Sequence, residues 1–370
     1  MTQPTTAPKR VLVTGVTGQD GSYMADYLLA NTDHLVYGMV RRTAKPDYGN
    51  IAGAMKSPRF KLVVGDLSDS QSIDNLVKEI RPDYLVNLAA QSFVGSSWQL
   101  PEQTIDVTGT GVARILEAVR KHAPACRTYS AGSSEQWGDV AYVPQDEKHP
   151  MRPRSPYGCA KCLASHLVKV YRESYGLYAV HAILTNHESE RRGAEFVTRK
   201  ISLGVARIVA AMKRGEPFEP ISLGNVDAKR DWSHAQDFVE GIWLMLNQEK
   251  PLEFVLASGE CHSVREFVER AFAAAGIAGA WFPGAKPEDE VFWLQGGTSQ
   301  SPSTVLVRID PAHYRPAEVD LLWGDSAAAR LQLGWQPKVS FDELVRRMVA
   351  SDIAAYAETQ RPATTERAAA

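Results

Sequence analysis

Short apolar runs alternate with amphipathic segments along the first half of the chain. Runs rich in β-branched and apolar residues recur as "RVLVT", "HLVYGMV", "FKLVVGDL", "PDYLVNLAA", "CRTYSAGSS" and "YAVHAILTNHES". Between them, segments such as "SQSIDNLVKEI" repeat their apolar residues at helical spacing. Near-continuous apolar strands that alternate with helices are typical of a parallel sheet covered on both faces. We therefore expect a doubly wound α/β fold over residues 10–188.

The alternation weakens beyond residue 188, where helical patterns dominate. Long amphipathic helices are predicted over "FVTRKISLGVARIVAAMKRG", "SVREFVERAFAAAG" and "SFDELVRRMVASDIAAY". These segments predict a smaller, mostly helical C-terminal lobe over 189–356, with residues near 228–258 returning to the first domain. The polar ends, 1–9 and 357–370, are expected to be loose tails.

Composition narrows the classes of partner. The 370 residues hold 41 Lys plus Arg against 43 Asp plus Glu, so no overall basic field indicates nucleic acid or an anionic membrane. No apolar run reaches the roughly 18 residues of a membrane span. The four cysteines are scattered, and Cys159 and Cys162 lack the second pair of a zinc site, so we interpret them as packing residues. A soluble protein of the reducing cytoplasm without a metal is expected.

A glycine-rich loop directly follows the first strand. Gly15, Gly18 and Gly21 have the spacing GxxGxxG, and the helix pattern begins within the loop. Such a loop lets main-chain N–H groups and a helix N-terminus approach the pyrophosphate of a dinucleotide. The alternative is a tight strand-to-helix turn without a ligand.

The residues after the second, third and fourth strands favour NADP as that dinucleotide. Arg41 and Arg42 follow the second strand, where an NAD-preferring fold usually has an acidic residue, and two guanidinium groups suit a 2′-phosphate. A solvated basic pair is the alternative. Asp66 follows the third strand and could accept from the adenine amino group. The fourth strand is followed by small or apolar residues that a nicotinamide ribose can approach, namely Leu88, Ala89 and Ala90.

Tyr157 and Lys161 lie four residues apart in "SPYGCAKC" and share one face of a predicted helix. An ammonium beside a phenol favours the phenolate, so we expect Lys161 to lower the pKa of Tyr157 toward a range useful for proton transfer. The spacing alone also fits two polar side chains on one helix face. The glycine loop and the preceding strands favour the catalytic interpretation.

Ser133 and Glu135 stand at the end of the fifth strand, in "SAGSSEQWG". The carboxyl ends of parallel strands meet at one edge of the sheet, so these side chains should lie near Tyr157. Hydride transfer needs only a serine, a tyrosine and a lysine, so the additional carboxylate of Glu135 requires an explanation. It is either a general base or only a capping residue.

With these motifs in place, the chain resembles the extended short-chain dehydrogenase/reductase family, and within it the GDP-mannose 4,6-dehydratases, over residues 10–356. The most specific matches are "TGVTGQDGSY", "NHESERRGAEFVTRKI", "LGNVDAKRDW" and "YRPAEVDLLWGD". The resemblance implies an internal NADP redox cycle, with oxidation at sugar carbon 4, loss of water across carbons 5 and 6, and return of hydride to carbon 6. Ser133, Glu135, Tyr157 and Lys161 would be the catalytic set, with Glu135 as the base of the elimination.

The resemblance also implies binding residues and partners. Further cofactor contacts would come from Thr17, Gln19, Asp20, Leu67, Ser92, His187 and Arg192. The GDP-sugar would be held by Asn186, Lys200, Arg230, Arg315 and Glu318, since a diphosphate needs cations and a carboxylate suits the donors of guanine. The expected partners are GDP-mannose or a related GDP-sugar and further copies of the chain, in a homodimer or homotetramer.

Several residues depart from the family pattern. Ser133 stands where threonine is expected, Phe93 where histidine is usual, "EQWG" replaces Glu-Leu-Tyr-Gly, and Glu190 replaces a proline. Phe93 and Trp137 could reshape the sugar pocket, so the sugar could be another hexose or a heptose. A GDP-sugar 4-epimerase, a 4-keto reductase and a non-catalytic NADP-binding sensor are the alternatives to a dehydratase.

Overall fold

A seven-stranded parallel sheet organises the first part of the chain in a computed structural model, which describes residues 7–295 and 304–359. Its strands are β1 (Arg10–Thr14), β2 (Leu35–Val40), β3 (Phe60–Val64), β4 (Tyr84–Asn87), β5 (Arg127–Ala131), β6 (Ala179–Leu184) and β11 (Phe254–Leu256). The strand order is β11-β6-β5-β4-β1-β2-β3, and all pairs are parallel. The expected doubly wound fold is confirmed, and the strand order reverses between β1 and β4, which is where such sheets bind ligands.

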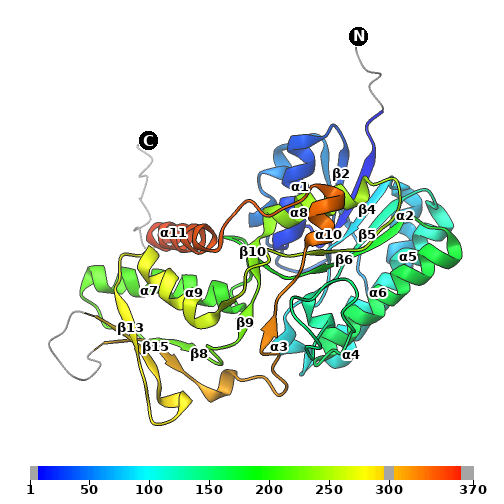
Figure 1. The fold of residues 1–370 in the computed structure, drawn as a ribbon. Helices are drawn as coiled ribbons and strands as arrows, with labels where there is room; N and C mark the ends of the chain where they lie inside the picture. The colour runs from blue at the N-terminus through cyan, green and yellow to red at the C-terminus, as the bar shows by residue number, and fades with distance from the viewer. Residues whose placement is uncertain (1–6, 296–303, 360–370) are drawn as a thin grey trace, which may run out of the picture. The chain divides into compact units, whose positions relative to one another are not determined.

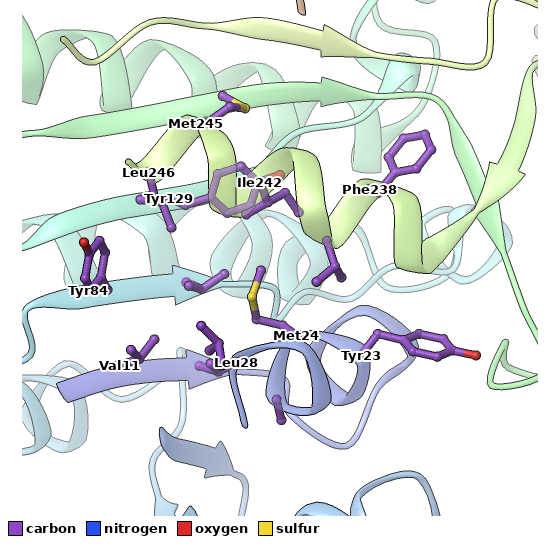
Figure 2. Close-up of a cluster of buried hydrophobic side chains, with 14 of the residues drawn as sticks. Val11, Tyr23, Met24, Leu28, Tyr84, Tyr129, Phe238, Ile242, Met245 and Leu246 are labelled. Atoms are coloured by element: carbon purple, nitrogen blue, oxygen red, sulfur yellow. The ribbon is translucent and has the colours of Figure 1, made fainter. Parts of the chain in front are cut away.

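Helices cover both faces of this sheet (Figure 1). On one face lie α1 (Gln19–Asn31) and α8 (Ala235–Leu246), and on the other lie α2 (Ser70–Ile80), α5 (Gly111–His122) and α6 (Pro156–Tyr175). Figure 2 shows Met24 and Leu28 of α1 together with Ile242 of α8 in one buried cluster against the strands. Each face of the sheet therefore has its own hydrophobic core. These two cores hold the strands in place, and with them the sheet edge where the loops after the strands begin.

Shorter elements complete this first unit, which comprises 1–193, 228–262 and 315–340. They are α3 (Val94–Ser97), α4 (Pro101–Thr104), the π-helical segment Ile105–Thr110, α10 (Ala327–Leu333) and two parallel strand pairs, β7 (Asn186–Glu188) with β10 (Trp232–His234) and β9 (Lys229–Arg230) with β16 (Leu321–Leu322). The predicted sixth strand is thus two strands, β6 and β7, separated at Thr185.

The second unit comprises 194–227, 263–314 and 341–370. Its helices are α7 (Val197–Arg214), α9 (Val264–Ala274) and α11 (Phe341–Thr359). A four-stranded sheet, which the sequence pattern did not indicate, is formed by β13 (Gly279–Phe282), β14 (Val291–Leu294), β15 (Val305–Ile309) and β8 (Ile221–Leu223). These strands are short and interrupted by polar loops, so their periodicity is weak. The two residues of β12 (His262–Ser263) precede α9.

The expected tails lie mostly outside the described residues, since 1–6 and 360–370 are not among them. None of the described helices is long and apolar enough to span a membrane. All four cysteines are free, and no cluster of metal-ligating side chains occurs within 7–295 and 304–359.

Candidate active site

The glycine loop forms a tight cradle between β1 and α1. Gly15 has a φ of +67°, and a side chain there would come within 2.8 Å of the Ala89 nitrogen. A Cβ on Gly21 would stand 2.2 Å from the Gly15 carbonyl oxygen. Gly18 donates its N–H to Gly15 (3.0 Å) and caps α1 without a side chain. The loop therefore keeps main-chain N–H groups close to the N-terminus of α1, which suits a pyrophosphate.

Gln19 and Asp20, the first residues of α1, bind β7 rather than solvent. The Gln19 amide donates to the main-chain oxygen of His187 (2.9 Å), and Asp20 Oδ2 lies 2.8 Å from His187 Nε2. His187 Nδ1 is 2.8 Å from the Thr185 carbonyl oxygen, so both ring nitrogens face acceptors. Burial opposes the charge, but Asp20 raises the pKa of His187, and His187 lowers the pKa of Asp20. The pair is therefore a charged link between two predicted cofactor loops.

The residues predicted to hold the adenosine half lie after β2 and β3. Arg41 and Arg42 are exposed, and Asp66 accepts from Ser68 N (2.9 Å) and Ser68 Oγ (2.8 Å). Burial alone would raise the pKa of Asp66, but the Ser68 donors and Arg41 lower it. Leu67 packs in the core, and its carbonyl oxygen accepts from Arg114 (2.8 Å), so its side chain does not face a ligand.

The loop after β4 is held by Thr14, a residue that sequence reasoning missed. Thr14 Oγ1 accepts from the N–H groups of Leu88 and Ala89, both at 3.1 Å. The loop continues through half-buried Ala90 to exposed Ser92. This arrangement brings the main chain beside the glycine loop, as the close approach of Ala89 to Gly15 also shows. Thr17 is half-buried, and its carbonyl oxygen accepts from Asn50 (3.0 Å).

Tyr157 and Lys161 project from the first two turns of α6. The helix is capped by Ser155, whose Oγ accepts from the Gly158 N–H at 3.0 Å. Lys161 Nζ donates to the Ala131 carbonyl oxygen (2.6 Å) at the end of β5 and lies 5.7 Å from the centre of the Tyr157 ring. The helix thus brings both side chains to the edge of the sheet where β5 ends.

The pKa values differ from the expectation for this pair. Burial raises the pKa of Tyr157 to about 12, although a hydrogen bond with Ser133 lowers it. Burial also lowers the pKa of Lys161 to about 8, against the opposing effect of Asp20. The prediction that Lys161 lowers the pKa of Tyr157 is therefore wrong for the protein alone, because desolvation outweighs the neighbouring ammonium.

Ser133 and Glu135 lie on a short 3-10 turn, Ser134–Gln136, directly after β5. The Ser133 hydroxyl accepts from the Glu135 N–H (3.2 Å) and lies close enough to Tyr157 to lower its pKa. Glu135 is only 8% exposed, and its Oε1 lies 3.5 Å from Nη1 of Arg315. The structure thus brings the predicted hydroxyl, phenol and carboxylate together. Glu135 does not cap the turn, since the cap is Ser133.

Most of the residues predicted to hold the sugar nucleotide form a charged network in the same unit. Glu318 Oε1 lies 3.1 Å from Arg230 and 3.7 Å from Arg315, and Arg315 also pairs with Glu135. Arg230 is buried on β9, and burial lowers its pKa. Asn186 Oδ1, on β7, is buried and has no hydrogen-bond partner among the described residues. Two guanidinium groups with a free amide oxygen suit a polar, anionic ligand.

Lys200 and Arg192 complete the predicted binding set. Lys200 belongs to the second unit, where its Nζ lies 3.1 Å from His313 Nε2. It lines a cavity of about 410 Å³ together with Arg207, Ser222 and Tyr356. Arg192 Nε lies 3.0 Å from Glu188 Oε2, directly after β7.

The residues that depart from the family pattern have clear positions. Trp137 is fully buried and packs with Ile183 and Val255, so it shapes the site only through the turn that precedes it. Glu190 accepts from the Tyr23 hydroxyl (2.9 Å) and lies 3.3 Å from His234 Nε2. Phe93 is half-buried and leaves no room for a side chain at Gly95.

Comparison with known proteins agrees with this geometry. The family model described as GDP-mannose 4,6 dehydratase matches residues 12–348. The chain is 46% identical to the GDP-mannose 4,6 dehydratase of Homo sapiens over 355 residues, covering 94% of this chain and 92% of that protein. It is 43% identical to the GDP-mannose 4,6-dehydratase of Yersinia enterocolitica over 357 residues, covering 93% and 94%.

Solved structures show the same fold. The UDP-glucose 4-epimerase of Thermus thermophilus, a complex with NAD, matches with a TM-score of 0.75 at 25% identity, covering 94% of this chain and 99% of that chain. RMD from Pseudomonas aeruginosa, complexed with NADPH, matches with a TM-score of 0.69 at 21% identity, covering 94% and 99%. From the extent and identity of the sequence matches, this chain belongs to the GDP-mannose 4,6-dehydratase family.

Proposed function

We propose that this protein converts GDP-mannose to GDP-4-keto-6-deoxymannose in an NADP-dependent dehydration. One observation supports this most directly: the carboxylate of Glu135 lies on the turn that Ser133 caps, and both Ser133 and Glu135 lie close enough to Tyr157 to change its pKa. A tyrosine and a serine suffice for oxidation of an alcohol, whereas removal of water from the oxidised sugar also needs a base for the carbon 5 proton.

The glycine cradle fits a dinucleotide. A Cβ at Gly15 or Gly21 would clash with main-chain atoms of the neighbouring loops, so glycine lets the loop close tightly on the first turn of α1, where main-chain N–H groups suit a pyrophosphate. The remaining contacts would come from Thr17, Gly18, Gln19, Asp20, Asp66, the main chain of Leu67, Ala89 and their neighbours Leu88, Ala90 and Ser92. Lys161, His187 and Arg192 would lie near the nicotinamide. The exposed pair Arg41 and Arg42 favours NADP over NAD. The bound dinucleotide supplies a reversible hydride acceptor.

Each catalytic side chain has a distinct role in this proposal. Tyr157 accepts the proton of the carbon 4 hydroxyl as that carbon is oxidised to a ketone, and Lys161 helps to stabilise the phenolate. The ketone acidifies the proton on carbon 5, and Glu135 removes it. Ser133 helps to pass a proton to the carbon 6 hydroxyl, which leaves as water. Hydride returned to carbon 6 makes the reaction redox-neutral.

The charged network would hold the nucleotide. Arg230 and Arg315 offer forked donors to a diphosphate, and Asn186 has an unused amide oxygen for a sugar hydroxyl. Glu318 would accept from guanine, and Lys200 would be a further cation for the GDP-sugar. Binding of GDP-mannose would have to exchange the Arg315–Glu135 ion pair for a contact with phosphate, which would release the Glu135 carboxylate for chemistry.

The cellular setting and assembly belong to the same proposal. Four free cysteines suit a reducing cytoplasm. Exposed apolar side chains on α6, including Leu163 and Val170, favour a homodimer or homotetramer. Light scattering on the purified protein measures the assembly directly.

Mass spectrometry with limiting NADP⁺ tests the reaction and its substrate together. The protein is incubated with GDP-mannose and, separately, with other GDP-hexoses and a GDP-heptose. A dehydratase yields a product lighter by one water over many turnovers per NADP⁺. A product of unchanged mass indicates a 4-epimerase, and a requirement for stoichiometric NADPH indicates a 4-keto reductase. Binding of NADP⁺ without any product would instead identify a sensor.

A further inference from the structure

The turn that holds Ser133 and Glu135 is fixed by a side chain with no assigned role, Gln136. The Gln136 Oε1 atom accepts from the Ser133 N–H at 2.9 Å, and the main-chain N–H of Gln136 donates to the Ser133 carbonyl oxygen at 3.1 Å. Gln136 is completely buried. The side-chain acceptor and the main-chain donor of Gln136 therefore close the turn together, and a leucine at this position would lose the first of these two bonds because its side chain offers no acceptor.

His181, on the neighbouring strand β6, binds the same oxygen. His181 Nε2 lies 3.0 Å from Gln136 Oε1, and the ring is 1% exposed. A main-chain N–H can only donate, so the atom that faces Ser133 N is the amide oxygen, and His181 Nε2 must then carry a proton. Burial lowers the pKa of His181 to about 3, so the ring stays neutral at the pH where enzymes work.

The neighbouring glycines show how closely the turn is packed. A Cβ on Gly132 would stand 2.4 Å from His181 Nε2 and 2.8 Å from Gln136 Oε1. On the other side, a Cβ on Gly158 of α6 would lie 2.6 Å from the Glu135 carbonyl oxygen. The turn is thus confined between β6 and the helix that presents Tyr157, and it has little room to relax.

The close packing of the turn has a larger effect on the direction of the Ser133 hydroxyl than it would have on a threonine hydroxyl at this position. Serine lacks the second heavy atom on Cβ that restricts the side-chain rotamer, so its hydroxyl depends on the main chain for its direction. The same main chain sets the position of Glu135. A displacement of about 1 Å in a catalytic group can cost about 100-fold in rate.

We propose that Gln136 and His181 are a positioning pair that holds Ser133 and Glu135 in place for the removal of water. The proposal rests on the dehydratase function above. Neither residue touches the substrate, and the pair acts through the turn. Oxidation at carbon 4 also uses the Ser133 hydroxyl, but the proton acceptor Tyr157 and its neighbour Lys161 are held by α6 and Ala131, whereas Glu135 stands on the turn itself, so the pair affects elimination more than oxidation.

Three variants test this proposal in the full-length protein with NADP⁺ and GDP-mannose. Gln136→Met removes the acceptor at nearly constant volume, His181→Leu removes the donor, and the double variant removes both. The matched control is Ile115→Ala, a buried change on α5 in the core of the sheet face that α5 shares with α6. Rapid mixing follows first-turnover formation of reduced cofactor, and mass spectrometry in D₂O follows exchange at carbon 5 and loss of water.

We expect both single variants to slow carbon 5 exchange and water loss by about 100-fold while first-turnover oxidation changes by less than about threefold. The double variant should be hardly slower than either single variant, because one substitution already breaks the pair. Nitrogen resonances of ¹⁵N-labelled His181 should shift in Gln136→Met without any substrate. Ile115→Ala should lower the melting temperature without separating the two stages.

The outcomes distinguish this proposal from the one on which it rests. If the unaltered protein shows neither carbon 5 exchange nor water loss, the dehydratase function fails and the positioning role fails with it. If the unaltered protein eliminates water and the variants do so equally fast, or slow both stages alike as Ile115→Ala does, only the positioning role is overturned.

Discussion

Glu135 is the residue that separates a dehydratase from a simple dehydrogenase in this site. Glu135→Gln keeps the size of the side chain but cannot accept a proton, so we expect water loss to fall by at least about 100-fold. Oxidation at carbon 4 should persist, and reduced cofactor should therefore accumulate and absorb at longer wavelength than NADP⁺. Glu253→Gln, which changes a carboxylate paired with Arg172 elsewhere in the unit, should leave turnover unchanged. Full water loss by Glu135→Gln would show that another group is the base.

Because Lys161 is buried, its contribution to the stability of the protein changes with pH in the alkaline range. Burial lowers its pKa from 10.5 to about 8, while Asp20 opposes the shift and Tyr157 lies beside it. Between pH 8 and 10.5 the unfolded chain binds the proton that the folded chain has released, so this group's contribution to stability rises with pH in that window. Below pH 8 both states are protonated, and the contribution no longer changes.

Thermal unfolding of the protein and of Lys161→Met across pH 7 to 11 measures this linkage. The melting temperature of the unaltered protein minus that of Lys161→Met should increase as pH rises from about 8 toward 10.5. A constant difference between the two proteins would show that Lys161 keeps its ordinary pKa in the folded state.

At the scale of elements, both the stability of the fold and the binding of NADP⁺ require α1 to lie close to the glycine loop. Gly21→Ala would place a methyl group 2.2 Å from the Gly15 carbonyl oxygen, so the helix must move away from the loop. We expect a loss of more than about 2 kcal/mol in the free energy of unfolding and NADP⁺ binding too weak to detect by calorimetry. Gly53→Ala is the control, because nothing lies within 4 Å of the added atom. Normal NADP⁺ affinity in Gly21→Ala would contradict the proposal that the glycine loop binds the pyrophosphate of NADP⁺.

The cap of α6 determines where the catalytic helix begins. Ser155 Oγ accepts from the Gly158 N–H, next to Tyr157. Ser155→Ala should lower the free energy of unfolding by about 1 kcal/mol and reduce turnover, whereas Ser155→Asp should retain most of both because aspartate is also a good cap. Denaturant titration and steady-state rates measure the two effects. Equal behaviour of the alanine and aspartate variants would show that the cap is unimportant.

The elements that could be predicted from sequence are those with strong local periodicity. The six strands "RVLVT" to "YAVHAIL" and the helix that begins near Tyr157 follow from runs and spacing alone. The strand β11 and the sheet of the second unit could not be predicted, because these short runs do not alternate with helices as the first six do, and β11 and β8 pair with strands that are distant in sequence.

The same distinction applies within the candidate site. The positions of Ser133, Glu135, Tyr157 and Lys161 at one edge follow from strand ends and a helical turn. The partners that fix them do not: Arg315 reaches Glu135 across 180 positions of sequence, and Gln136 meets His181 across 45. The raised pKa of Tyr157 could not be predicted either, because desolvation depends on burial that no local pattern reveals.

At the scale of the whole molecule, both units are assembled from three separate stretches of chain, so the last helix is needed to complete the second one. In that unit α11 packs against α7 and α9, and its buried Asp352 lies 2.7 Å from Arg199 and accepts from Ser202 (2.6 Å). These contacts tie the final segment of the unit to its first. A carboxylate buried in this way stabilises the fold chiefly because its removal leaves a buried cation without its counter-charge.

Asp352→Ala should therefore lower the free energy of unfolding by about 3 kcal/mol. Hydrogen exchange should quicken along α7, α9 and α11, while α1 stays protected and NADP⁺ still binds, because the predicted cofactor residues all belong to the first unit. Asp342→Ala, at an exposed position of the same helix, is the matched control and should change little. Exchange mass spectrometry and calorimetry with NADP⁺ measure both predictions. Faster exchange along α1 as well would mean that the two units unfold as one, and the integrity of the cofactor fold would then depend on the C-terminal helix.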